Sequence, residues 1–429
     1  MRIDQLRVRN FRCFEEREFA LNPRFNVLVG ENGSGKTAVL EALSVAIGSL
    51  FLGLKGCGER HLRREDARLR VFQSGREWNF EPKYPVEVDA VGEVASMPVR
   101  WMRTLATAKG RTTSYAAKEI KRVAADLDRR VGDGDDVILP LVAFYGTGRL
   151  WLQPRDRGQP NSGGKEELSR RAGYWAALDP RCNPRELMRW IERQDYAAYQ
   201  EGEESPLYRT VKHAMVTMVE NARDIRYAPR RKEVVVTFER GDPQAFENLS
   251  DGQRSMLALA GDIATRMARL NPHLGERALA ETPGVVLIDE MDLHLHPTWQ
   301  RHLVEDLRST FPSVQFIGTT HSPFIIQTLR EGELITLDDH QPLPNLGSLG
   351  IAEIAEGVMG VDNAEVSPRY QEMVGVAHDY LSALDKAAVY LDEPLETFKE
   401  RLAEQIAPYA DNPAFQAYLE RKQAVALGE

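Results

Sequence analysis

The sequence predicts an α/β fold in which a mostly parallel sheet is flanked by helices. Short apolar runs, among them 25–29, 285–288 and 315–319, have the length and composition of strands that are buried on both faces. From residue 249 onward such runs alternate with amphipathic helical segments, which is typical of parallel sheets that are covered by helices. A chain of 429 residues with 42% apolar content can bury a core of this size.

The N-terminal part predicts an antiparallel β lobe. Apolar residues alternate through 2–21 on both sides of Asn10 to Arg12, which indicates a hairpin that leads into strand 25–29. A helix is expected from 38 to about 48, because apolar residues recur there at helical spacing. Residues 86–94 predict a further strand. The predicted strands of the lobe therefore come both before and after the first helix in the sequence.

The remaining elements follow from apolar periodicity and from clusters of turn residues. In order, we expect helix 114–131, strand 137–145, a mobile loop 153–168, helices 187–201 and 207–222, strand 233–238, helix 253–270, strand 285–288, helix 298–309, and strands 315–319 and 333–337.

Two regions are expected along the chain. The first is a head of residues 1–340, with insertions at about 52–135 and 150–232 that include helical segments. The second is a helical C-terminal tail, 341–429, which carries no recognisable chemistry of its own and is a candidate for binding a partner.

Charge is unevenly distributed along the chain. Residues 1–240 hold 42 Lys and Arg against 34 Asp and Glu, a net of +8, whereas 241–429 hold 13 against 30, a net of −17. The basic half suits a polyphosphate ligand or nucleic acid, and the acidic half suits a basic partner or simple solvation.

The sequence also indicates where the protein works. No run approaches eighteen apolar residues and the N-terminus lacks a secretory pattern, so we expect a cytoplasmic protein that does not cross a membrane. Cys13, Cys57 and Cys182 are too few and too scattered for a disulfide framework and are expected to be free thiols.

Residues 30–37 form a complete G-x-x-x-x-G-K-[ST] phosphate loop directly after a predicted buried strand. Its glycines allow backbone N–H groups to surround phosphate oxygens at a helix N-terminus. Lys36 is expected to reach the β- and γ-phosphates, and Thr37 to bind Mg²⁺. The motif therefore predicts ATP and Mg²⁺ as ligands, with these further binding residues: Asn32, Gly33, Ser34 and Gly35.

A second acidic element ends the apolar run 285–288. Asp289 and Glu290 come at the carboxyl end of this strand, where ligands bind in parallel sheets. Asp289 is expected to hold Mg²⁺ and Glu290 to polarise the water that attacks phosphate. The alternative is a strand that merely ends in solvent-exposed acids.

The segment from Leu249 to Gln253 opens a helix. Ser250 or Asp251 can cap it, and Ser250 and Gly252 can donate to phosphate at an N-terminus whose dipole favours negative charge. The alternative is a well-capped core helix with no ligand.

Three further residues have more than one interpretation. His321 follows strand 315–319, so it is expected near the γ-phosphate, although a single histidine is usually structural. Arg12 and Arg149 follow strand ends, and each can approach the phosphate of ATP or of nucleic acid, or be a surface arginine. Arg226 and Arg230 to Lys232 are interpreted as a solvated turn, with nucleic acid as the alternative.

With these motifs in this order, the chain resembles the RecF/SMC/Rad50 branch of ATP-binding-cassette (ABC) ATPase heads. Members of this branch often begin with a strand followed by Asn-Phe-Arg, as at Asn10 to Arg12. More narrowly, 145–151, 249–254, 289–297 and 315–323 resemble the ATPases that include PtuA of the Septu anti-phage system and retron-associated ATPases.

The resemblance implies several properties of the site. Ser250, Gly252 and Gln253 would bind the γ-phosphate held by a second subunit, and His321 would be a switch histidine. Asp251 replaces the usual second glycine, and the glutamine of the family's glutamine-containing loop is not identifiable, with Gln73 only a candidate.

The resemblance also implies a function. It implies an ATPase that forms a homodimer or higher oligomer and controls a partner nuclease, of the HNH type in Septu. The alternatives are a stand-alone RecF-like repair ATPase that binds duplex DNA and a self-sufficient nuclease. The last is disfavoured because no metal-binding acidic cluster follows residue 340.

Overall fold

The computed structural model divides the chain into two compact units, Met1–Gly360 and Val361–Glu429. Each unit is described by itself. The residues that the structure describes are 1–74, 77–148, 169–180, 184–338, 345–389, 394–409 and 411–427.

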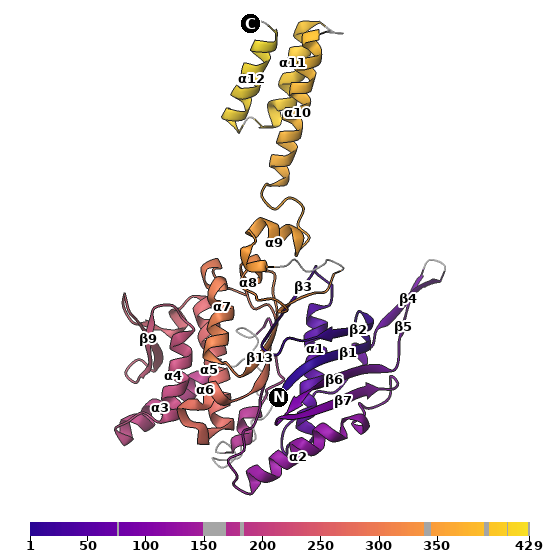
Figure 1. The fold of residues 1–429 in the computed structure, drawn as a ribbon. Coiled ribbons are helices and arrows are strands. Elements are labelled where there is room, and N and C mark those ends of the chain that lie inside the picture. The colour runs from indigo at the N-terminus through magenta and orange to yellow at the C-terminus, as the bar shows by residue number, and fades with distance from the viewer. Residues whose placement is uncertain are drawn as a thin grey trace. The chain divides into compact units, whose positions relative to one another are not determined.

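A parallel sheet forms the centre of the first unit (Figure 1). Within the described residues it has five strands in the order β14-β3-β13-β12-β8. All side chains of β3, β8, β12 and β13 are buried, which explains why these strands are mostly apolar. The strands are β3 (Phe25–Val29), β8 (Leu141–Tyr145), β12 (Gly284–Ile288), β13 (Val314–Thr319) and β14 (Leu334–Thr336).

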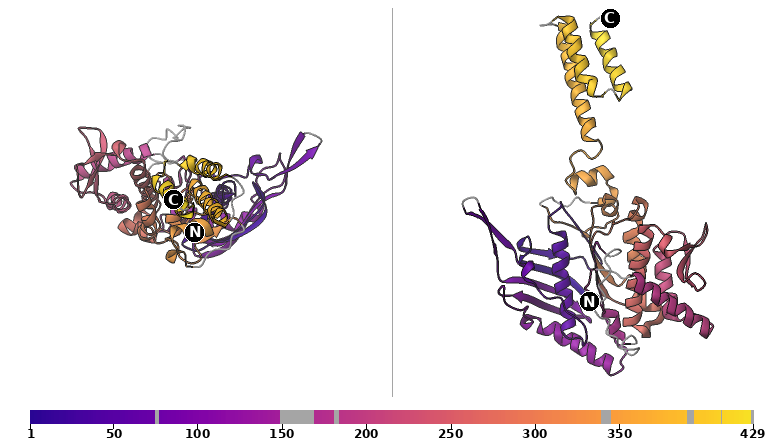
Figure 2. Two further views of the ribbon diagram at one scale, coloured as in Figure 1. Left: turned by 90° about the horizontal axis from the view of Figure 1, so that it is seen from above. Right: turned by 180° about the vertical axis from the view of Figure 1, so that it is seen from behind.

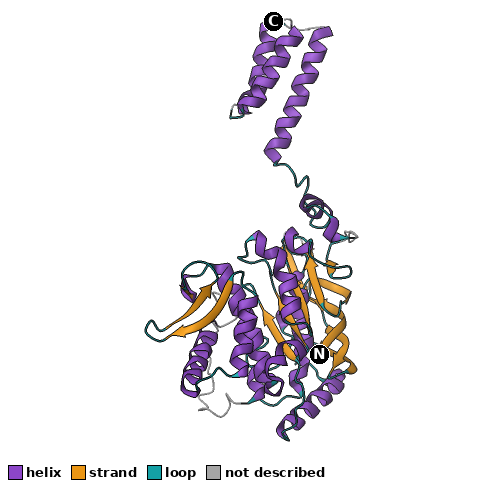
Figure 3. Ribbon diagram, turned by 60° about the vertical axis from the view of Figure 1, so that its left-hand side comes forward, coloured by secondary structure: helices purple, strands orange, loops and turns teal. Residues whose placement is uncertain are grey.

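Helices flank this sheet and form the rest of its core (Figure 3). Helix α1 follows β3 and is buried along most of its length, while α4 packs against α5. The helices of this part are α1 (Lys36–Ile47), α3 (Pro184–Glu201), α4 (Pro206–Thr217), α5 (Asp251–Leu270), α6 (Ala278–Glu281), α7 (Pro297–Thr310), α8 (Pro323–Ile326) and α9 (Ile351–Gly357).

The antiparallel β lobe has the strand order β2-β1-β6-β7. Side chains of β6 alternate between buried and half-buried, as expected for a sheet with one face on a core. Trp101 of β7 is buried and donates from Nε1 to the carbonyl of Ala46 at 2.9 Å, which fastens the lobe to α1. The elements are β1 (Arg2–Phe11), β2 (Phe14–Ala20), β6 (Val86–Val94), β7 (Met97–Leu105) and the covering helix α2 (Lys118–Gly132).

A two-stranded hairpin, β4 (Leu69–Ser74) and β5 (Glu77–Pro82), projects beyond the lobe (Figure 2). Its register pairs Val71 with Phe80, so these two side chains share one face. Their exposed fractions are 49% and 61%. The hairpin therefore presents apolar side chains to solvent. A second small sheet consists of β9 (Ala222–Ala228), β10 (Glu233–Phe238) and β11 (Gln244–Ala245).

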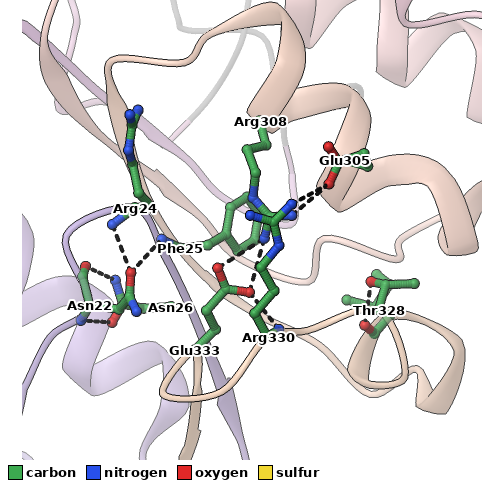
Figure 4. A network of polar contacts seen from close by, with 10 residues as sticks. Asn22, Arg24, Phe25, Asn26, Glu305, Arg308, Thr328, Arg330 and Glu333 are labelled. Atoms are coloured by element: carbon green, nitrogen blue, oxygen red, sulfur yellow. Dashed lines mark hydrogen bonds and ion pairs between the residues drawn. The ribbon is translucent and has the colours of Figure 1, made fainter. Parts of the chain in front are cut away.

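A buried ion pair fixes the edge of the sheet opposite the phosphate loop (Figure 4). Arg308 at the end of α7 donates from Nη2 to both carboxylate oxygens of Glu333, each at 2.9 Å. The guanidinium lies 5.8 Å from the centre of the Phe25 ring, and the backbone carbonyl of Glu333 accepts from Val27 at 2.8 Å. These contacts hold β14 and α7 against the start of β3.

The second unit is helical and has its own small core. It consists of α10 (Pro368–Val389), α11 (Leu395–Ile406) and α12 (Pro413–Leu427). Its buried apolar residues are Tyr380, Leu384, Phe398, Leu402, Ile406 and Leu419. No helix in the described part of the chain is long and apolar enough to span a membrane.

Several element boundaries differ from those predicted. Strand 137–145 begins only at Leu141, because Pro140 has no N–H to donate and the N–H of Leu139 is bound by Asn271 at 2.8 Å. Helix 207–222 ends at Thr217, and Arg226, predicted in a turn, lies in β9 and is paired with Asp224.

Some strands were not predicted, and some predicted features fall on residues that the structure does not describe. Strands β4, β5, β7 and β9 were not predicted, and α2 begins at 118 rather than 114 because 115–117 form a 3₁₀ turn. Loop 153–168, Arg149 and Cys182 lie outside the described residues.

Candidate nucleotide site

The phosphate loop connects β3 to α1. Gly33 and Gly35 have φ of 90° and 102°, a region of backbone conformation that favours glycine, and α1 begins at Lys36. A Cβ on Gly35 would lie 2.6 Å from Cys13 Sγ and from the Phe14 ring. The loop therefore has its observed path only with glycine at that position.

Lys36 is folded back onto this loop. Its Nζ donates to the carbonyls of Gly30 at 2.7 Å and Glu31 at 2.9 Å. Burial lowers the pKa of Lys36, and the nearby carboxylates of Asp338, Asp289 and Glu290 oppose that shift. An anion in the loop would accept from the ammonium in place of these carbonyls.

Ser34 provides an observation that favours an anionic ligand in this loop. Its Oγ is buried and has no hydrogen-bond partner within the described structure. A buried hydroxyl without a partner is costly. Phosphate oxygens at the start of α1 would supply acceptors for this hydroxyl and for the first N–H groups of the helix.

Asp289 is held from three sides. Its Oδ2 accepts from Thr37 Oγ1 at 3.2 Å and its Oδ1 from Thr319 Oγ1 at 2.7 Å. Its backbone N–H donates to the carbonyl of Tyr145 at 2.7 Å. Asp289 as a whole is 6% exposed. A hydroxyl and a carboxylate are oxygen ligands of the kind that Mg²⁺ prefers, so Thr37 and Asp289 fit this ion.

Glu290 follows in a strained backbone conformation. Its φ is 47°, which is uncommon for a residue with a side chain, and its N–H donates to Thr319 Oγ1 at 2.7 Å. Thr319 therefore contacts both acidic residues through one hydroxyl. This fixes the backbone of Glu290 beside the phosphate loop while its side chain remains partly exposed.

His321 lies just past β13, at the same edge of the sheet. Its ring is exposed, and its backbone N–H donates to Asp292 Oδ1 at 3.2 Å. Asp292 also accepts from Thr320 Oγ1. Asp292 therefore joins the segment after Glu290 to the segment that carries His321.

The segment at Ser250 forms a capping box at the start of α5. Ser250 Oγ accepts from the N–H of Gln253 at 3.3 Å and donates to Gln253 Oε1 at 3.0 Å, while Gln253 Oε1 also accepts from the N–H of Ser250 at 3.1 Å. A Cβ on Gly252 would lie 2.7 Å from the carbonyl of His294. These hydrogen bonds of Ser250 run within its own cap rather than to the phosphate loop.

Arg12, Arg149 and Asp338 remain to be placed relative to the phosphate loop. Arg12 is paired through Nη2 with Glu41 at 2.8 Å and Asp66 at 2.9 Å. Arg149 lies outside the described residues. Asp338, which the sequence did not single out for the site, accepts from the N–H of Glu31 at 2.8 Å and so supports the phosphate loop.

The sheet thus brings one group of the predicted site residues together at one edge. At the carboxyl ends of β3, β12 and β13 lie Lys36, Thr37, Asp289, Glu290 and His321. No role was predicted from the sequence for Thr319, Asp292 and Asp338. Thr319 and Asp338 come at or just after the two strands that neighbour β3, and this position could have indicated that they lie near the phosphate loop.

Family comparisons agree with this geometry. Residues 5–197 match the family described as "AAA domain", and residues 160–327 match the one described as "AAA domain, putative AbiEii toxin, Type IV TA system". Together with the relatives below, these matches support a nucleotide-binding ATPase that is similar to RecF and to defence ATPases.

Relatives connect the chain to defence and repair ATPases. "Retron Vc95 probable ATPase" of Vibrio cholerae serotype O1 biovar El Tor is 23% identical, over 78% of this chain and 74% of that protein. "Septu protein PtuA" of Bacillus mycoides (strain KBAB4) is 25% identical over 79% of this chain, and the match spans only 41% of PtuA. "DNA replication and repair protein RecF" of Anaeromyxobacter sp. (strain Fw109-5) is 25% identical over 75% of this chain and 92% of that protein.

Proposed function

We propose that two copies of this chain close around ATP and that the closed pair controls a bound nuclease in an anti-phage defence complex. The observation that carries the proposal is how the two predicted half-sites are bonded within one copy. Thr37 and Asp289 are joined by a hydrogen bond, whereas the hydrogen bonds of Ser250 stay within its own helix cap. A second copy would bring the Ser250 segment to this phosphate loop.

Within one copy, each residue has a distinct role. Lys36 and the N–H groups of the loop bind the phosphates, with Arg12 proposed as a further contact to nucleotide. Thr37 and Asp289 would hold Mg²⁺, which would neutralise phosphate charge. Glu290 orients and polarises the attacking water, which in phosphoryl transfer is mainly positioning. His321 donates to the γ-phosphate from the end of β13.

The second copy contributes a helix N-terminus. Ser250 Oγ and the N–H of Gly252 donate to the γ-phosphate, and the dipole of α5, a helix of 20 residues, favours the negative charge there. Gln253 holds Ser250 in position through the capping box. ATP then joins the two copies, and hydrolysis separates them.

The partner that we propose is a nuclease, of the HNH type if the complex is Septu-like. The support is the similarity to a retron ATPase and to Septu PtuA. The helical unit of residues 361–429, with a core of its own, is the proposed docking element for that partner.

A second candidate function is a RecF-like repair ATPase that binds duplex DNA. It is favoured by the match to RecF over 92% of that protein and by the net +8 of residues 1–240. Binding of a duplex oligonucleotide by the purified chain alone, with affinity that falls steeply as salt rises, would support this candidate.

The shared site is tested by mass measurement with and without ATP and by mixing two inactive variants. Ser250→Arg blocks the half-site that acts in trans, and Lys36→Ala blocks the phosphate loop. If the site is shared, mixing the two variants restores about one working site per mixed pair, whereas each variant alone is inactive. A per-molecule rate of the native chain that is independent of protein concentration would contradict the dimer.

The nuclease partner is tested separately, by purifying the chain together with the products of adjacent genes. We expect a nuclease to co-purify, and its cleavage of DNA or RNA to differ between the Lys36→Ala complex and the native complex. Co-purification of no nuclease, together with tight duplex binding, would favour the RecF-like candidate.

A further inference from the structure

We propose that Tyr145 is a positioning residue for ATP hydrolysis, because its two polar groups join Asp289 to the α5 helix. The inference deepens the proposed function and rests on it, since α5 carries the Ser250 segment that would meet the nucleotide of a second copy. Tyr145 itself is the last residue of β8 and is 3% exposed.

The backbone of Tyr145 contacts the acidic strand end directly. Its carbonyl accepts from the N–H of Asp289 at 2.7 Å. The parallel register places Tyr145 opposite Ile288, so this bond continues the β8–β12 ladder by one residue. A shift of β8 along its axis would therefore move the backbone of Asp289.

The side chain of Tyr145 points to a different element. Its hydroxyl donates to Asp262 Oδ2 in the middle of α5 at 2.7 Å. The same oxygen accepts from Arg266 Nε at 2.7 Å. Arg266 Nη1 also donates to the carbonyls of Gly173 at 3.0 Å and Trp175 at 2.8 Å. Asp262 is thus fixed in place and fixes the tyrosine in turn.

Helix α5 can carry displacement between these contacts and its N-terminus. Asp262 lies twelve residues after Ser250 in the sequence, which is about 18 Å along a helix axis. The helix runs without interruption from Asp251 to Leu270 and is buried along most of its length. A movement of α5 that aligns Ser250 with phosphate would therefore displace Asp262. Through the hydrogen bonds of Tyr145 it would also displace Asp289.

Tyr174 offers a matched control. It is also 3% exposed, and its hydroxyl donates to the carbonyl of Pro140 at 2.8 Å. Tyr174→Phe removes a buried hydroxyl of the same kind close to β8 without touching the bond to Asp262. A general cost of losing a buried tyrosine hydroxyl should affect Tyr174→Phe and Tyr145→Phe alike.

The test compares kcat and KM for ATP in Tyr145→Phe, Asp262→Asn, the double variant and Tyr174→Phe. We expect kcat to fall about 3- to 10-fold in the two single variants, as for loss of a positioning hydrogen bond, with KM unchanged. The double variant should be no slower than the slower single variant, because both changes remove the same hydrogen bond between Tyr145 and Asp262. Tyr174→Phe should keep the native kcat.

Two results would overturn the inference: a kcat of the native value in both single variants, or a loss in the double variant equal to the product of the single losses. If Tyr145→Phe fails to fold, as judged by near-ultraviolet circular dichroism, the kcat and KM of Asp262→Asn decide alone. These outcomes are independent of the proposed dimer, which is tested separately by mass measurement, by mixing the two inactive variants and by the dependence of the native rate on protein concentration.

Discussion

Thr37 and Asp289 are 252 residues apart in the sequence, and the hydroxyl of the first donates to the carboxylate of the second at 3.2 Å. The contact joins the start of α1 to the end of β12, two elements that are far apart in the sequence. It exists because β3 and β12 both border β13 in the parallel sheet. The strand order therefore assembles the proposed cation site before any ion binds.

Lys36→Ala should abolish nucleotide binding. The ammonium now bonded to Gly30 and Glu31 is the charge that would meet the phosphates. Equilibrium binding of a fluorescent ATP analogue is expected to weaken at least about 100-fold, a loss typical of a buried charge-assisted contact. Lys109→Ala, in an exposed loop, is the control and should bind as the native chain does. Equal affinity of the two variants would contradict this role.

Glu290→Gln should bind ATP yet hydrolyse it very slowly. The substitution keeps the size of the side chain and removes the charge that polarises water, so kcat should fall by about 10² or more. The ATP-bound variant should accumulate as an associated form in light-scattering measurements. Hydrolysis at the native rate would remove Glu290 from the mechanism.

Arg308→Ala should destabilise the first unit strongly. The side chain of Glu333 is 4% exposed, so removing the guanidinium leaves a buried carboxylate that has lost its charged partner and keeps the N–H of Arg330, at 2.8 Å, as a donor. We expect a loss of about 3–5 kcal/mol in the free energy of unfolding, measured by urea denaturation. Arg330→Ala, whose side chain is 64% exposed, is the control and should change stability by about 0.5 kcal/mol or less. Similar losses in both variants would show that burial of the pair does not govern its contribution.

Bound nucleotide should protect Cys13 from alkylation. This exposed thiol lies against Gly35 of the phosphate loop. Modification at pH 8, followed by mass spectrometry of the peptide that contains Cys13, should slow about threefold or more when the thiol becomes covered by ATP. Cys57 should react slowly in either state, because burial raises its pKa to about 11. In Lys36→Ala, ATP should give Cys13 no protection, and protection there would mean that the effect does not come from this site.

The sequence predicted the central strands well and the periphery poorly, for a physical reason. Strands β3, β12 and β13 are buried on both faces, so each is mostly apolar, although Asn26 in β3 and Gln315 in β13 are buried polar residues. Strand β7 was not predicted because Arg103 interrupts its apolar pattern. In the structure Arg103 is 1% exposed and paired with Glu59, a compensation that only the tertiary structure supplies.

The candidate site divides in the same way. The phosphate loop and Asp289 are visible because each carries a local motif. Thr319, Asp292 and Asp338 have no motif of their own, and their place beside the loop depends on strand order and on the turns that follow each strand. The route from Tyr145 to Asp262 spans 117 residues and could not be inferred from spacing.

The capping box of Ser250 bears on how long the proposed pair of copies stays closed. Because the hydroxyl already donates to the neutral amide of Gln253, contact with a phosphate on another copy would exchange that hydrogen bond for a stronger, charge-assisted one, a gain that exists only while nucleotide is bound. The cap itself would survive, since the same oxygen still accepts from the N–H of Gln253. The closed pair would therefore be short-lived without nucleotide, and the lifetime of bound ATP would set how long a partner receives the signal.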